Sequence, residues 1–101
     1  MKTLVIAEFP AKEGKFEELE ATLRAALVDT RAFDGCISLE TYLHRESKTF
    51  TLIEDWESAD HYAKYIAWRM ETGLGEMLDA LLVDGIASFN PRTFAAQLPA
   101  R

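Results

Sequence analysis

The sequence predicts an α+β fold of the ferredoxin-like type, with the element order β-α-β-β-α-β and an extra helix before the last strand. Apolar residues recur at strand spacing in segments 2–9, 36–44 and 49–56, and at helical spacing in the segments that separate and follow them. A short polar link joins the second strand to the third, so these two should pair as an antiparallel hairpin. We therefore expect a four-stranded antiparallel sheet with helices on one face.

The first elements are a strand and a long helix. Residues 2–9 carry apolar side chains at both alternating sets of positions, which indicates a strand that is buried on both faces. Pro10 ends this strand, because proline cannot donate to the ladder of hydrogen bonds. Residues 14–33 place leucines and alanines along one helical stripe, and Gly35 supplies the stop.

Two more helices and a strand complete the chain. Ser58 is a suitable N-cap for a helix that runs to about Glu71 and breaks near Gly73. A shorter helix follows over the leucine-rich residues 74–82. Residues 92–98 lie between two prolines and have the pattern of a short last strand.

Length, charge and cysteine content limit the classes of function. The 101 residues match the commonest domain size and contain no linker, so we expect a single domain over 1–101. A net charge of −6 argues against nucleic acid as a partner. No apolar run approaches the roughly 20 residues of a membrane span, and the first residues do not have the pattern of a signal peptide. The single cysteine, Cys36, fits a reducing compartment, so we expect a cytoplasmic protein without a membrane partner. Two histidines and one cysteine, none at ligand spacing, predict no metal site.

The feature that most strongly indicates function is a cluster of aromatic residues. Trp56, Tyr62, Tyr65 and Trp68 fall within thirteen consecutive positions, and Arg69 follows directly. Large rings that each carry one polar group suit a half-dry cavity, because the ring is buried while its N–H or O–H still needs a partner. Helical spacing puts both tyrosines and the arginine on one face. We expect a small-molecule site here.

The third strand contributes to the same region. Alternation brings Leu52, Glu54 and Trp56 to one side of it, but leaves open whether that side faces the helices or a partner sheet. Glu54 and His61 are the candidate proton acceptors. Simpler interpretations also exist: Trp56 could be a core residue, and Arg69 could pair with a carboxylate of the strand.

The apolar character of the strands predicts a partner. The two main helices can cover only one face of the sheet, although the strands carry apolar residues on both. A second copy of the same sheet is the simplest cover for the other face. We therefore expect a homodimer.

Three segments resemble the antibiotic biosynthesis monooxygenase family of dimeric α+β barrels. They are residues 10–16, residues 34–38 and, above all, Leu-Ile-Glu-Asp-Trp-Glu-Ser at 52–58, in the order that the family has. The resemblance implies a dimeric α+β barrel. It also implies a monooxygenase that needs no cofactor and oxidises an aromatic quinol or anthrone-type substrate with O₂.

The resemblance also implies roles for individual residues. Trp56 matches the tryptophan at the end of the family's third strand, and Tyr62 matches a tyrosine that contacts substrate in anthrone-oxidising relatives. Tyr65 stands where quinol-oxidising relatives have histidine, and Leu52 where anthrone-oxidising relatives have asparagine. These departures keep open an alternative function, a dimeric protein that binds an aromatic metabolite without turning it over. The implied catalytic residues are Trp56, Tyr62 and Tyr65, and the implied substrate-binding residues are Leu52, Glu54, His61 and Arg69.

Overall fold

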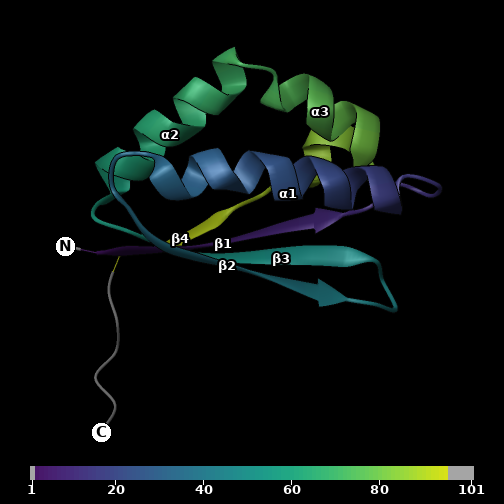
Figure 1. Cartoon of the computed structure of the whole chain (residues 1–101), viewed down its shortest axis with the longest axis horizontal. Helices are drawn as coiled ribbons and strands as arrows, with labels where there is room; N and C mark the ends of the chain where they lie inside the picture. The colour runs from purple at the N-terminus through teal and green to yellow at the C-terminus, as the bar shows by residue number, and fades with distance from the viewer. Residues whose placement is uncertain (1, 96–101) are drawn as a thin grey trace, which may run out of the picture.

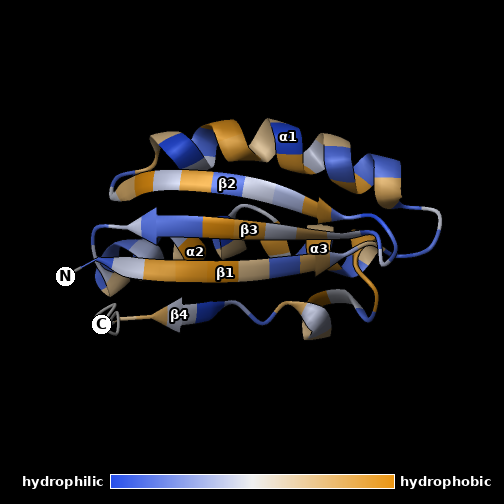
Figure 2. Ribbon diagram, turned by 90° about the horizontal axis from the view of Figure 1, so that it is seen from below, coloured by the Kyte–Doolittle hydropathy of each residue, from blue (hydrophilic) through white to orange (hydrophobic). Residues whose placement is uncertain are grey.

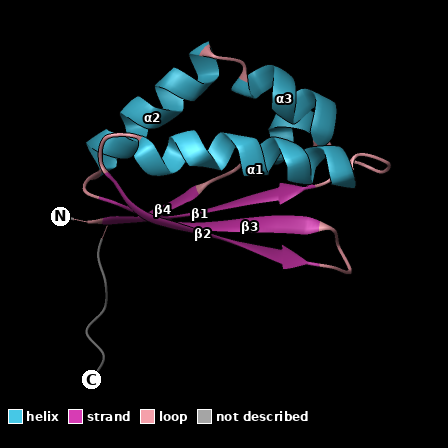
Figure 3. Cartoon of the chain, in the orientation of Figure 1, coloured by secondary structure: helices cyan, strands magenta, loops and turns pink. Residues whose placement is uncertain are grey.

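A computed structural model describes residues 2–95 and shows a four-stranded antiparallel sheet with the helices on one face (Figure 1, Figure 3). The elements are β1 (Thr3–Pro10), α1 (Phe16–Ala32), β2 (Cys36–His44), β3 (Thr49–Trp56), α2 (Ala59–Glu71), α3 (Leu74–Leu81), the 3-10 helix η1 (Gly85–Ser88) and β4 (Arg92–Phe94). This order confirms the predicted ferredoxin-like α+β fold with its extra helix. The last strand was expected over 92–98, and residues 96–98 lie outside the described part of the chain.

The strand order is β2-β3-β1-β4, and β2 and β3 form the expected antiparallel hairpin. In the central pair of strands, Leu52 of β3 lies opposite Ala7 of β1, and Glu54 lies opposite Val5. All four side chains are buried, so this side of the strands faces the helices. Alternation alone left open whether this side of β3 faces the helices or a partner sheet, and the structure shows that it faces the helices.

The core between sheet and helices has two parts. The larger part is mostly aliphatic and is built from α1, α3 and the middle of the sheet, with Leu19, Leu78 and Leu82 fully buried. The smaller part is aromatic and lies where β3 meets α2; its buried members are Val5, Trp56, Tyr62 and Tyr65. No helix among residues 2–95 is both long and apolar enough to cross a membrane.

The other face of the sheet is bare in the described chain and carries an apolar strip at its centre (Figure 2). Leu4 of β1 lies opposite Phe94 of β4, and Ile6 lies opposite Ile53 of β3. Phe94 is 39% exposed and Ile53 is 37% exposed. The remaining outward positions of β2 and β3 are mostly polar. Of the three longer strands, therefore, only β1 is apolar on both faces along most of its length.

The start of α2 is held against the turn between α1 and β2. Ser58 caps the helix as predicted, because its hydroxyl accepts a hydrogen bond from the backbone N–H of His61 at 3.2 Å. The backbone N–H of Glu57 donates to the carbonyl of Gly35 at 2.8 Å. Gly35 has a φ of +95°, and a Cβ at this position would overlap the ring of His61. Glycine is required here for both reasons.

We predict that Gly35→Ala destabilises the protein. The left-handed backbone costs an alanine on the order of 1–3 kcal/mol, and the overlap with His61 adds to that cost. Gly14→Ala is the matched control, because Gly14 also has a positive φ, +79°, but has open space around its Cβ position. Urea denaturation should show the larger loss of unfolding free energy for Gly35→Ala. Equal losses for the two variants would show that the contact with His61 is unimportant.

Candidate functional site

A cavity of about 190 Å³ lies between the sheet and the helices. Strands β1 and β3 line it from below, and side chains of α1, α2 and α3 line it from the helical layer, together with Phe89 after η1. The aromatic part of the core adjoins one end of this cavity and the aliphatic part adjoins the other. The cavity therefore joins segments that are far apart in the sequence.

Most of the residues predicted for the site meet at this cavity. The alternation of β3 and the helical spacing of α2 place them there, because the two elements turn these faces toward each other. Those that line the cavity are Leu52, Glu54, Tyr62, Tyr65 and Arg69.

Trp56 is placed behind the cavity and does not line it. Its side chain is fully buried, with ring centroids 5.0 Å from Tyr65, 5.6 Å from Tyr62 and 6.3 Å from Phe33. Its indole N–H donates to Oε1 of Glu54 at 2.8 Å. Trp56 can therefore act on a bound molecule only through its neighbours.

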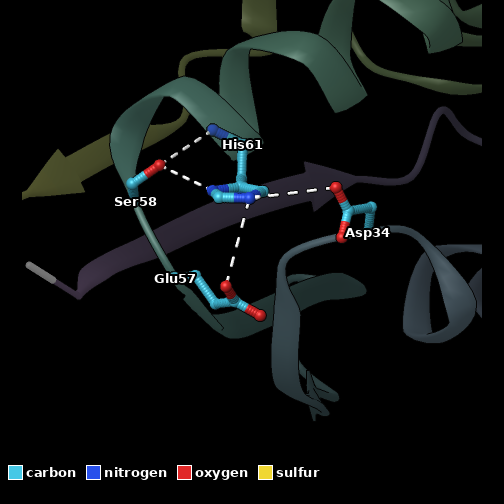
Figure 4. A network of polar contacts seen from close by, with 4 residues as sticks. All are labelled: Asp34, Glu57, Ser58 and His61. Atoms are coloured by element: carbon cyan, nitrogen blue, oxygen red, sulfur yellow. Dashed lines mark hydrogen bonds and ion pairs between the residues drawn. The ribbon is translucent and has the colours of Figure 1, made fainter.

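His61 also lies outside the cavity lining, at the outer start of α2 (Figure 4). Its Nδ1 is 2.7 Å from the hydroxyl of Ser58. Its Nε2 is 3.9 Å from a carboxylate oxygen of Asp34 and 4.0 Å from one of Glu57. Among residues 2–95, no three His, Cys, Asp or Glu side chains are grouped so that they could hold a metal ion.

Among residues 2–95, Glu54 is the one carboxylate that lines the cavity. It is 4% exposed, and burial raises the pKa of its carboxyl, while the hydrogen bond from Trp56 opposes that rise. Only Oε1 receives a hydrogen bond within the described chain, so Oε2 has none there. A buried carboxylate with one oxygen held and one available is suited to accept a proton from a bound molecule.

Tyr62 presents a hydroxyl without a hydrogen-bond partner among residues 2–95. Burial raises the pKa of Tyr62, and the nearby Glu54 carboxylate and Tyr65 raise it further. The phenol therefore stays protonated at neutral pH. It can donate a hydrogen bond to an oxygen of a bound molecule.

Tyr65 belongs to a buried polar network between α1 and α2. Its hydroxyl is 2.6 Å from the hydroxyl of Thr30 and accepts a hydrogen bond from Nε of Arg69 at 2.9 Å. Nη2 of Arg69 donates to Thr30 at 2.9 Å and to the carbonyl of Ala26 at 2.6 Å. Arg69 thus donates to hydroxyl and carbonyl oxygens and forms no ion pair with a carboxylate among residues 2–95. The alternative prediction, that Arg69 pairs with a carboxylate of the third strand, is therefore wrong for the described chain.

Thr30 is a residue of this site that the sequence interpretation missed. It is 1% exposed and continues the buried stripe of α1 after Leu19, Leu23 and Leu27. A threonine at the end of a leucine stripe is the available signal, because a buried hydroxyl requires a partner. That partner, Tyr65, is 35 residues away in the sequence.

Comparisons with known proteins agree with this fold. No curated protein matches the sequence. Among solved structures, protein SO0527 from Shewanella oneidensis is 26% identical, with a TM-score of 0.79 over 92% of this chain and 88% of its own. NE2512, a protein of unknown function from Nitrosomonas europaea, is 21% identical, with a TM-score of 0.77 over 99% of this chain and 96% of its own.

A third structure has a described activity. SnoaB, a cofactor-independent oxygenase from Streptomyces nogalater, is 15% identical, with a TM-score of 0.77 over 98% of this chain and 96% of its own. At that identity the likeness shows the fold alone. The family model described as antibiotic biosynthesis monooxygenase matches residues 3–68, which include the predicted site residues except Arg69. The chain belongs to the antibiotic biosynthesis monooxygenase family.

Proposed function

We propose that the protein is a cofactor-independent monooxygenase that oxidises an aromatic quinol or anthrone-type substrate with O₂. The observation that carries the proposal is the buried Glu54 carboxylate, with one oxygen free at an otherwise mostly apolar cavity. Membership of the family supports the reaction class, and the described activity of SnoaB supports a reaction without a cofactor.

In the proposed reaction, Glu54 takes the proton of a substrate hydroxyl. The resulting electron-rich anion passes one electron to O₂, and the two radicals combine to form a carbon–oxygen bond. The peroxide then loses water, so one oxygen atom enters the product and the other leaves as water. For a simple quinol, C₆H₆O₂ + O₂ gives C₆H₄O₃ + H₂O, and the substrate supplies all the electrons.

The neighbouring side chains bind and orient the substrate in this proposal. Tyr62 donates a hydrogen bond to the developing oxyanion. Tyr65, whose hydroxyl is held by Arg69 and Thr30, lines the cavity with its ring and orients the substrate. Leu52 forms part of the apolar wall. Trp56 is a positioning residue, because it holds Glu54 and lines no part of the cavity.

We also propose that the protein forms a homodimer through the bare face of the sheet and acts in the cytoplasm. The apolar strip of Leu4, Ile6, Ile53 and Phe94 supports the dimer, because a second copy would remove it from water. The single cysteine supports the location, because a chain without disulfides is typical of reducing compartments.

We predict that Glu54→Gln lowers kcat by about 10²- to 10⁴-fold, the usual contribution of a general base. The readout is oxygen uptake with a panel of reduced quinones and anthrones, without added flavin or metal. The variant should be at least as stable as the wild type at pH 7, because burial opposes ionisation of Glu54 and the amide has no charge. The matched control is Glu46→Gln, in the exposed turn between β2 and β3.

Two results would contradict the proposal. An unchanged kcat in Glu54→Gln would remove Glu54 as the proton acceptor. Ligand binding by the wild type without any oxygen uptake would favour the alternative, a binding protein for an aromatic metabolite.

We predict that kcat rises with pH through the raised pKa of Glu54, because only the carboxylate form accepts a proton. In Trp56→Phe this rise should move to higher pH, since the hydrogen bond that lowers the pKa of Glu54 is gone. Trp68→Phe serves as the control, because Trp68 makes no hydrogen bond to Glu54. If both variants keep the wild-type pH profile, the indole does not tune the carboxyl.

We predict that sedimentation at micromolar concentration shows a dimer and that Ile53→Asp yields a monomer. A charge at the centre of the apolar strip would be buried without a partner. Val28→Asp is the control, because Val28 is 66% exposed on α1, away from the bare face. A wild-type protein that sediments as a stable monomer would refute the dimer.

A further inference from the structure

Resting on the homodimer of the proposed function, we infer how its two sheets face each other. The two-fold axis runs parallel to the strands, and Glu40 of each protomer forms an ion pair with the partner's Arg92. The apolar strip by itself favours a second copy on the bare face. The charges beside the strip determine the orientation in which that copy binds.

One row of neighbouring residues crosses the bare face from edge to edge. The register places Glu40 of β2 opposite Ile53 of β3, Ile53 opposite Ile6 of β1, and Ile6 opposite Arg92 of β4. Residues that lie directly opposite in neighbouring strands point to the same face of a sheet. Because β2 and β4 are the two edges (Figure 2), the row has a carboxylate at one edge, two isoleucines at its centre and a guanidinium at the other edge.

The two charged ends of this row cannot pair within one chain. Three strand spacings separate β2 from β4, a distance of about 14 Å. Glu40 accepts a hydrogen bond from the hydroxyl of Tyr42 at 3.0 Å, and the Cζ of Arg92 lies 5.8 Å from the ring centroid of Phe94. Among residues 2–95, neither Glu40 nor Arg92 is in an ion pair, and both are exposed. Both charges are therefore available to a second copy.

A two-fold axis parallel to the strands brings the unlike ends of two rows together. It reverses the order of the strands in the second sheet, so that each β2 lies across from the partner's β4. Glu40 then faces the partner's Arg92 at both edges, and Ile53 faces the partner's Ile6 at the centre. Aligned sheets pack about 10 Å apart, a gap that a glutamate and an arginine side chain can span together.

An axis that lies across the strands would bring the like ends together instead. Each Glu40 would then face the partner's Glu40, and each Arg92 the partner's Arg92, which is unfavourable at an interface. The other carboxylates of the middle strands, Glu8 and Asp55, lie in the two neighbouring rows, and Asp55 already accepts a hydrogen bond from Ser38 at 3.3 Å. The charges of the central row therefore select the axis parallel to the strands.

Two charge-reversal variants, studied by sedimentation equilibrium, test this arrangement. Glu40→Arg brings two arginines together at each edge of the dimer, and Arg92→Glu brings two glutamates together. Each variant alone should raise the Kd of dimerisation about tenfold or more. An equimolar mixture of the two should form a heterodimer about as tight as the wild type, because each mixed contact again joins an arginine to a glutamate. That recovery also shows that both variants are folded.

Glu8→Arg is the matched control, because Glu8 is an exposed carboxylate on the same face, opposite Thr51 in a neighbouring row. Both Glu8→Arg and Glu40→Arg make the net charge of −6 less negative by two, so a general charge effect would tighten both dimers. We expect only Glu40→Arg to weaken dimerisation. A Glu40→Arg dimer as tight as the wild type, or a mixture as weak as its separate components, would overturn the arrangement.

The homodimer and the arrangement fail in different ways. A wild-type protein that stays monomeric overturns both. A wild-type dimer that both single variants leave intact preserves the homodimer and overturns the pairing of Glu40 with the partner's Arg92. Neither residue lines the cavity, so oxygen uptake tests the monooxygenase proposal separately.

Discussion

The candidate site depends on one interaction, the hydrogen bond from the indole N–H of Trp56 to the buried carboxylate of Glu54. Removing a carboxylate from water is costly unless hydrogen bonds compensate for the loss. Within the described chain, only Oε1 of Glu54 accepts a hydrogen bond, Oε2 accepts none, and the side chain lines the cavity. Oε2 keeps some contact with solvent, because no fully buried side-chain nitrogen or oxygen among residues 2–95 lacks a hydrogen-bond partner. The arrangement sacrifices stability in the way that functional sites often do.

The network between α1 and α2 keeps this carboxylate unpaired. Arg69 is the cation at the cavity, and a direct ion pair with Glu54 would lower the pKa of the carboxyl and make it a weaker base. Instead, Arg69 is held by Thr30, Tyr65 and the carbonyl of Ala26. The same contacts join the two helices above the sheet. The hydrogen bonds of Arg69 therefore both join α1 to α2 and hold the guanidinium away from the carboxylate of Glu54.

Much of the fold could be predicted from periodicity and local signals. Alternation in β1 and β3, the leucine stripe of α1 and the cap at Ser58 are properties of short segments, which depend little on the rest of the chain. Helical spacing also predicted that Tyr62 and Arg69 share the face that lines the cavity. The short helix η1 has no such periodic signal, because four residues are too few to show one.

The sequence by itself determined which elements form and which side chains share a face, because both depend on spacing along the chain. Only the tertiary structure decided which of those side chains reach the cavity. Alternation puts Trp56 and Glu54 on the same side of β3, yet the neighbouring rings of Phe33 and Tyr65 cover the indole and leave the carboxylate at the cavity. Two partners of Arg69, Thr30 and the carbonyl of Ala26, were likewise undecided, because they lie on α1, about forty residues away, and no local pattern records that contact.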